Sequence, residues 1–314
     1  PYSGGSIRGI AMILCRQLLI LFFFMLLGFG MAKRKILDQH NSGFLSWLIV
    51  NVANPALILS GGIGNSIDRR ELFKVVLVAA GVYLFLIVVS EIAVRLLGVD
   101  RKEAGIYKVL LIFTNMGFMG FPLLDAMYGA EALLYGAVFL LLFNLLIYTY
   151  GIFRIAGTAG SPAEILKKFV NPGVAAGVLA IMLAFLRVEL PGSVNQTISM
   201  LSNLTAPLSM MVIGASLLEV QWKGFLRDIR LLIFVVLRLV IIPVLGMLIL
   251  RNFVSNQYLL GACFVTLAAP SGSMAAMLAR QYRADYVTAS KGIGLTTLLS
   301  VITMPLLFWV FQLR

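Results

Sequence analysis

Two long apolar stretches of this chain are each interrupted by residues that weaken a helix. The first interruption runs from Thr114 to Pro122 and contains two glycines, and the second runs from Ala269 to Ser273 and contains Pro270. Proline removes a backbone donor and clashes with the preceding turn, while glycine lowers helix propensity. Inside a bilayer, freed backbone groups are tolerated only where they are buried in protein or line a cavity. The interruptions therefore predict two broken helices with a purpose other than anchoring.

The composition places almost the whole chain in a membrane. Of its 314 residues, 61% are hydrophobic and 12% are charged, whereas a soluble domain is about half apolar and about a quarter charged. No polar segment is long enough to form a separate soluble domain. We therefore predict an all-α integral membrane protein.

Ten membrane spans are expected, because about twenty apolar residues cross the hydrocarbon core. The first five form an N-terminal unit over residues 1–156, a cytoplasmic linker covers 157–169, and the last five form a C-terminal unit over 170–314. The predicted spans are 10–32, 44–63, 72–97, 104–127, 132–155, 170–188, 194–218, 229–251, 256–280 and 286–312. Spans four and nine are the broken ones.

The basic residues predict the orientation. One set of alternate loops carries sixteen Lys and Arg residues and the other carries eight, which favours a cytoplasmic position for the first set. Both termini then lie outside a bacterial inner membrane. The formal net charge of +12 comes from these short groups and not from a continuous basic face with interleaved aromatics, so no nucleic-acid partner is expected.

The N-terminal and C-terminal units contain similar short sequence motifs. The segment from Asn51 to Pro55 resembles that from Asn203 to Pro207, and the segment from Tyr128 to Glu131 resembles that from Tyr282 to Asp285, at offsets of 152 and 154 residues. Five spans per unit make the second unit enter the membrane in the opposite sense. The pattern predicts two inverted five-helix repeats, a sign of a transporter. The alternative is that Pro and Gly are simply common in membrane helices.

A binding site is predicted where spans four and nine cross. The N-terminal ends of half-helices carry free N–H groups and a partial positive charge, which hold an anion without a basic side chain. The candidate substrate-binding residues are Thr114, Asn115, Gly117, Asn54, Asn144, Pro270, Ser271, Gly272 and Ser273. For the hydroxyl and amide side chains, bonding to the preceding helical turn or between helices is the alternative.

Ionisable residues inside spans are candidates for coupling or for the transport pathway. Asp125 follows the first break and is a candidate proton site. Glu91 is also explained by an ion pair with Arg95 one turn later. Arg238 lines the pathway or pairs with Glu91 or Asp125, and the sequence leaves this choice open.

Enzymatic, metal and cofactor chemistry are not expected. His40 is the sole histidine and lies in a polar loop, while Cys15 and Cys263 lie in apolar spans. A phosphate-binding Gly-Lys-Ser/Thr loop and paired carboxylates within the spans are missing from the sequence. A channel is less suited than a carrier to broken helices in inverted repeats.

Taken in order along all ten spans, several short motifs resemble those of prokaryotic members of the auxin efflux carrier family. They are Asn54-Pro55, Asn115 to Pro122, Tyr135 to Phe139 with Asn144, Asn203 to Pro207, Gly214 to Ser216, Ala269-Pro270 and Ala289 to Pro305. The chain departs from the family pattern, which pairs Pro with Asn at each crossover. Thr114 stands before Asn115, and Ser271 follows Pro270.

The resemblance implies a secondary transporter for small organic anions such as indole acetate or dicarboxylates. It implies a scaffold of spans one, two, six and seven, a separate transport domain that moves like an elevator as in sodium/bile acid symporters, and a homodimer formed through the scaffold among membrane lipids. A transporter-like receptor without net transport is the alternative. The identity of the acid, the direction of transport, and uniport, proton or sodium coupling are left open.

Overall fold

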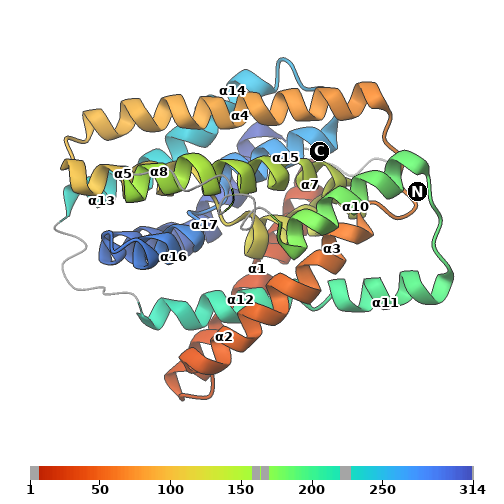
Figure 1. The fold of residues 1–314 in the computed structure, drawn as a ribbon, viewed down its shortest axis with the longest axis horizontal. Helices are drawn as coiled ribbons and strands as arrows, with labels where there is room; N and C mark the ends of the chain where they lie inside the picture. The colour runs from red at the N-terminus through yellow and green to blue at the C-terminus, as the bar shows by residue number, and fades with distance from the viewer. Residues whose placement is uncertain (1–6, 158–162, 164–169, 220–227, 313–314) are drawn as a thin grey trace.

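The computed structural model describes residues 7–157, 163, 170–219 and 228–312 (Figure 1). In these residues the regular structure is helical, apart from one isolated antiparallel bridge. Six helices are long and apolar enough to cross a membrane, in agreement with the predicted multi-pass all-α protein. They are His40–Ser60, Arg69–Leu96, Ala130–Ala156, Gly192–Ser216, Ile229–Leu250 and Tyr286–Phe311.

The helices follow the predicted spans closely. Those of the N-terminal part are α1 (Ile7–Lys33), α2 (Gln39–Leu48), η1 (Ile49–Ala53), α3 (Asn54–Ser60), α4 (Arg69–Leu96), α5 (Arg101–Ile112), η2 (Met116–Gly120), α6 (Phe121–Tyr128), α7 (Ala130–Leu146), η3 (Ile147–Gly151) and α8 (Ile152–Ala156). Those of the C-terminal part are α10 (Pro172–Leu186), α11 (Gly192–Ser202), α12 (Thr205–Ser216), η4 (Leu217–Glu219), α13 (Ile229–Val236), η6 (Leu237–Ile241), α14 (Ile242–Leu250), α15 (Gln257–Ala268), α16 (Met274–Gln281) and α17 (Tyr286–Phe311). Of the predicted linker 157–169, residues 158–162 and 164–169 lie outside the described residues.

Both predicted helix breaks are confirmed. Span four divides into α5 and the pair η2–α6, and span nine divides into α15 and α16. The first break precedes Pro122, which lies in the first turn of α6, directly after η2. In Figure 1, α5 and α16 lie toward the left of the molecule and α15 toward the right.

In the described part of the chain, three of the four π-helical segments directly precede a helix with a proline in its first turn. Pro55, Pro122 and Pro243 stand in the first turns of α3, α6 and α14, immediately after η1, η2 and η6. A proline ring clashes with the carbonyl four residues earlier, and the wider π-turn is a known way to absorb such a disturbance within a helix. The prolines therefore bend these spans without ending them.

The helices of spans one, two, six and seven pack closely on one another. α1 lies along α12, and α3 lies against both α10 and α11. Small residues permit this approach. A Cβ atom at Gly28 would overlap the backbone of Met211, and one at Gly214 would overlap the backbone of Met25.

Polar side chains connect the other spans. Asn256 donates to Glu71 Oε1 at 3.0 Å and to the Tyr135 hydroxyl at 2.9 Å, and the Tyr135 hydroxyl donates to Glu71 Oε1 at 3.3 Å. The Oδ1 atom of Asn256 also accepts the first free N–H groups of α15. One hydrogen-bonded cluster thus holds the ends of α4, α7 and α15 together.

Candidate functional site

The two helix breaks lie against each other and pair as a short antiparallel bridge between Thr114 and Ser271. The Asn115 N–H donates to the Pro270 carbonyl at 2.9 Å, and the Gly272 N–H donates to the Phe113 carbonyl at 2.8 Å. Backbone groups freed by the breaks thereby satisfy each other, as a low-dielectric interior requires. The predicted meeting of the two interruptions is present, and we call this paired segment the crossover.

Gly272 allows the crossover to close. A Cβ atom at this position would lie 2.7 Å from the Thr114 carbonyl oxygen and 3.0 Å from the Thr114 carbonyl carbon. Both neighbours are backbone atoms that are held by the bridge itself. A side chain here would therefore push the two breaks apart.

The hydroxyl and the backbone N–H of Ser271 both form hydrogen bonds within the protein. Its hydroxyl donates to the Leu110 carbonyl at 2.8 Å, near the end of α5, and its N–H donates to the Thr296 hydroxyl at 3.2 Å. The hydroxyl thus satisfies a carbonyl at a helix end where the regular partner is lost. Its donor is not available to a ligand.

Asn115, which follows the bridged Thr114, keeps a side-chain donor without a partner in the described part of the chain. Its Oδ1 accepts the Phe118 N–H at 3.3 Å and so caps η2. Its Nδ2 has no hydrogen-bond acceptor among the residues that the structure describes. The two breaks therefore differ chemically. The Ser271 hydroxyl in the second break donates to a carbonyl of the protein, whereas the Asn115 amide in the first break has a free N–H donor.

Two buried oxygen atoms next to this amide lack hydrogen bonds in the described part of the chain. They are Thr114 Oγ1 and Asn54 Oδ1, in side chains that are 2% and 8% exposed. Asn54 reaches the crossover from α3, where its Nδ2 lies 3.4 Å from the point at which a Cβ of Gly117 would stand. Unsatisfied buried polar atoms are costly, so Thr114 and Asn54 are candidates for contact with a ligand.

The remaining predicted binding residues lie at different places. Pro270 accepts through its carbonyl in the bridge, and Ser273 begins α16 without capping it through its side chain. Asn144 donates to the Leu140 carbonyl at 2.9 Å and accepts from Asn171 at 3.1 Å. The structure thus joins Asn144 to the start of α10 and not to a residue of the crossover.

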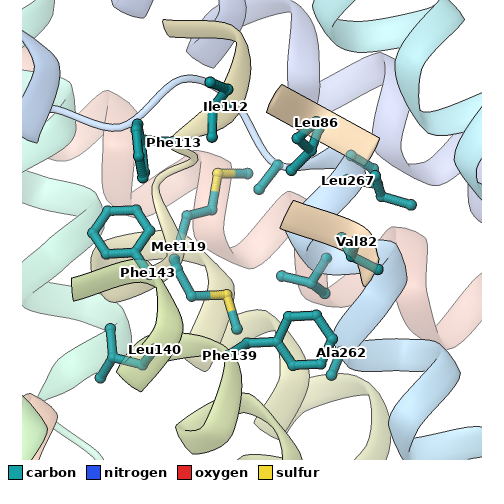
Figure 2. Packing of buried hydrophobic residues seen from close by; sticks show 14 of the residues in the cluster. Val82, Leu86, Ile112, Phe113, Met119, Phe139, Leu140, Phe143, Ala262 and Leu267 are labelled. Carbon is teal, nitrogen blue, oxygen red and sulfur yellow. The ribbon is translucent and has the colours of Figure 1, made fainter. Parts of the chain in front are cut away.

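Apolar side chains enclose the crossover. Figure 2 shows Ile112, Phe113 and Met119 beside Phe139 and Phe143 of α7. The rings of Phe113 and Phe143 meet edge to face, with centroids 5.4 Å apart. The polar groups inside this shell are almost fully buried.

Arg238 contacts the end of α15, immediately before the second break. Its side chain is 0% exposed, and it donates to the carbonyls of Leu267 and Ala269 at 2.6 Å each. Its partners are these main-chain carbonyls at the end of α15, so the expected pairing with Glu91 or Asp125 is not found. Asp125 is half-buried in α6 and forms no ion pair within the described residues.

Glu91 connects three spans. It pairs with Lys108 of α5 at 2.7 Å, with Arg154 of α8, and it accepts the Tyr150 hydroxyl at 2.9 Å. These partners replace the expected pair with Arg95 on the next turn. The sequence did not signal them, because both cations stand among the basic residues that mark the ends of spans.

Neutralising Glu91 is expected to destabilise the protein without changing ligand binding. In Glu91→Gln, two partly buried cations lose the carboxylate between them, at a cost of about 1–2 kcal/mol after allowance for solvent screening. The measurement is thermal unfolding of the purified protein at fixed pH. Glu189→Gln, at an exposed position, is the matched control. Equal unfolding temperatures for the two variants would contradict a structural role for the Glu91 pairs.

A surface groove lies away from the crossover, at the opposite end of α15. It is lined by Met247, Arg251, Ser255, Gln257, Leu260, Phe311 and Gln312. It lacks the paired backbone and the unsatisfied buried oxygens of the crossover. We therefore place the candidate site at the crossover.

Comparison with known sequences decides the family. The profile of the membrane transport protein family, which includes the auxin efflux carriers, matches residues 13–164 and 159–308. The chain belongs to this family. An uncharacterised transporter of Methanocaldococcus jannaschii is 26% identical over 309 residues, which are 93% of this chain and 97% of the relative. An uncharacterised transporter of Methanothermobacter thermautotrophicus is 25% identical over 286 residues, which are 90% and 93% of the two chains.

A bacterial relative extends the comparison. The uncharacterised transporter YfdV of Escherichia coli is 22% identical over 313 residues, which are 95% of this chain and 97% of YfdV. The resemblance to prokaryotic auxin efflux carriers is thus confirmed. Family membership and the apolar spans together describe a multi-pass membrane transporter and point away from an enzyme.

Proposed function

We propose that this member of the family is a secondary transporter for small organic anions in the cell membrane, with both termini outside. The observation that carries the proposal is the crossover, where Asn115 at the start of η2 has a free amide donor and Thr114 and Asn54 have unsatisfied buried oxygens. A helix start of this kind favours an anion. The closed apolar shell fits a site that opens to one side of the membrane at a time.

Matched helix contacts support the proposed inverted repeat of residues 1–156 and 170–314. α1 on α12 corresponds to α10 on α3, α4 on α5 corresponds to α14 on α15, and α6 on α7 corresponds to α16 on α17. A Cβ atom at Gly62 would overlap the backbone of Ala180, just as one at Gly214 would overlap that of Met25. From Gly62 to Gly214 is 152 residues, which is the offset of the first sequence match.

The distribution of hydrogen bonds supports an elevator movement. Side-chain bonds between distant elements gather in spans three, four, five, eight, nine and ten, through Glu71, Glu91, Arg238 and Ser271. The bond from Asn171 to Asn144 crosses to the proposed scaffold. These six spans are joined to one another by side-chain hydrogen bonds and meet the scaffold mainly through apolar surface. Few hydrogen bonds would therefore break if they moved together relative to the scaffold. We further propose that two copies dimerise through this scaffold.

Uptake by proteoliposomes tests the function. We expect protein-dependent uptake of labelled indole-3-acetate or succinate into vesicles, faster under counterflow and absent from protein-free vesicles. Binding of these acids without flux under any gradient would contradict the carrier and favour the receptor. Replacing sodium at fixed pH and voltage then distinguishes sodium coupling from uniport or proton coupling.

A further inference from the structure

Arg238 is a fully buried charge without a buried counter-ion. Its guanidinium bonds to the carbonyls of Leu267, Ala269 and, at 3.5 Å, Thr266. In the part of the chain that the structure describes, the side-chain ion pairs are the two made by Glu91. A buried charge is costly unless it is paired, so the positive charge at this point needs an explanation.

Pro270 explains why the guanidinium is held here. Thr266 is four residues before Pro270, and proline has no N–H to return to that carbonyl. The open carbonyls at the end of α15 also carry the negative end of the helix dipole, about half an elementary charge. Arg238 satisfies these carbonyls, and its full charge reverses the sign of that helix end.

The other helix ends at the crossover do not cancel this charge. The starts of η2 and α16 are partly positive, and the end of α5 is partly negative. The Leu110 carbonyl at that end is capped by the neutral Ser271 hydroxyl. With the end of α15 included, the half-charges sum to about zero, and the charge of Arg238 remains.

The charge acts at short range on the free polar groups of the site. Ala269, which accepts from the guanidinium, precedes Pro270, whose carbonyl accepts from the Asn115 N–H. The side chains of Asn115 and Thr114, the second with an unpartnered Oγ1 and 2% exposed, thus belong to the strand that pairs with the segment capped by Arg238. A low-dielectric shell strengthens the field between such neighbours.

We propose that Arg238 is a specificity-determining residue that makes the crossover select carboxylate anions over uncharged molecules of the same shape, through its charge and without touching the ligand. This inference rests on the proposed function, and it narrows that function to a class of ligand. Arg238 is thus a positioning residue for the ligand's charge and a structural cap for α15.

Affinity ratios test the proposal. The probes are indole-3-acetate, benzoate and succinate, each against its uncharged amide, titrated into purified full-length protein. We expect the wild type to prefer the acid by about tenfold or more, Arg238→Gln to lose about that factor while it binds the amide unchanged, and Arg238→Lys to keep the preference. Arg251→Gln, which removes an exposed arginine, is the control and is expected to keep the wild-type ratio.

Each outcome is decisive. An unchanged ratio in Arg238→Gln would overturn the role of Arg238 and leave the proposed function standing. Failure of the wild type to bind any of the acids would overturn the proposed function itself.

A measurement on the wild type covers the case in which Arg238→Gln does not fold. Salt screens exposed charges over about 8 Å at physiological ionic strength and buried charges much less. We expect the preference for the acid to persist in high salt. Its disappearance would assign the selectivity to an exposed cation and overturn the proposal.

Discussion

Replacing Gly272 with alanine is expected to abolish transport and to lower the thermal stability of the protein. The new Cβ would lie 2.7 Å from the Thr114 carbonyl oxygen and 3.3 Å from the Phe113 carbonyl oxygen. Overpacking of this kind costs about 1–3 kcal/mol. It also separates the backbone pairs that hold the first turns of η2 and α16 in place. Ligand binding is expected to be lost together with flux.

The matched control is Gly81→Ala, in the middle of α4. Nothing lies within 4 Å of a Cβ built at Gly81. Alanine there is expected to leave transport unchanged and to stabilise the helix by up to about 0.5–1 kcal/mol. Thermal unfolding and vesicle uptake measured on both variants separate the two cases. Uptake by Gly272→Ala at the wild-type rate would contradict this prediction. It would show that transport does not require the close backbone pairing of the two breaks.

Replacing Asn115 with alanine is expected to weaken ligand binding strongly while the protein stays folded. The change deletes the free Nδ2 donor and the cap on the Phe118 N–H, and a lost cap costs about 1 kcal/mol. The backbone bond from residue 115 to Pro270 remains. Loss of a hydrogen bond to a charged ligand costs about 1.5–3 kcal/mol, so affinity is expected to fall roughly tenfold to a hundredfold.

Asn51→Ala is the matched control, because Asn51 bonds to Trp47 one turn earlier on the same helix and not to the crossover. Titration calorimetry gives the affinities, and size-exclusion chromatography shows whether each variant is folded and monodisperse. Equal affinities for Asn115→Ala and Asn51→Ala would remove Asn115 from the site.

The features that the sequence predicted well are local. The interruption at Pro270 ends α15 within two residues, because proline acts on its own preceding turn. The first interruption was located less well, since Pro122 suits the first turn of α6 and the break falls at Phe113 to Asn115. Asn54 and Gly117 lie close together, and their role in binding stays a prediction.

The partners of polar side chains escaped prediction because they come from distant parts of the chain. Ser271 bonds to Leu110, which is 161 residues earlier, and Arg238 bonds to carbonyls that exist as free acceptors only because Pro270 breaks α15. Main-chain acceptors carry no residue type, so the sequence contains no signal for them.

The position of a bound acid tests the central claim most directly. We suggest solving the structure with saturating 5-bromoindole-3-acetate and locating bromine by its anomalous scattering. We expect the bromine peak beside the crossover, with the carboxylate density within hydrogen-bonding distance of Asn115 Nδ2. A peak in the groove lined by Arg251, Gln257 and Phe311, with none at the crossover, would contradict the proposed site.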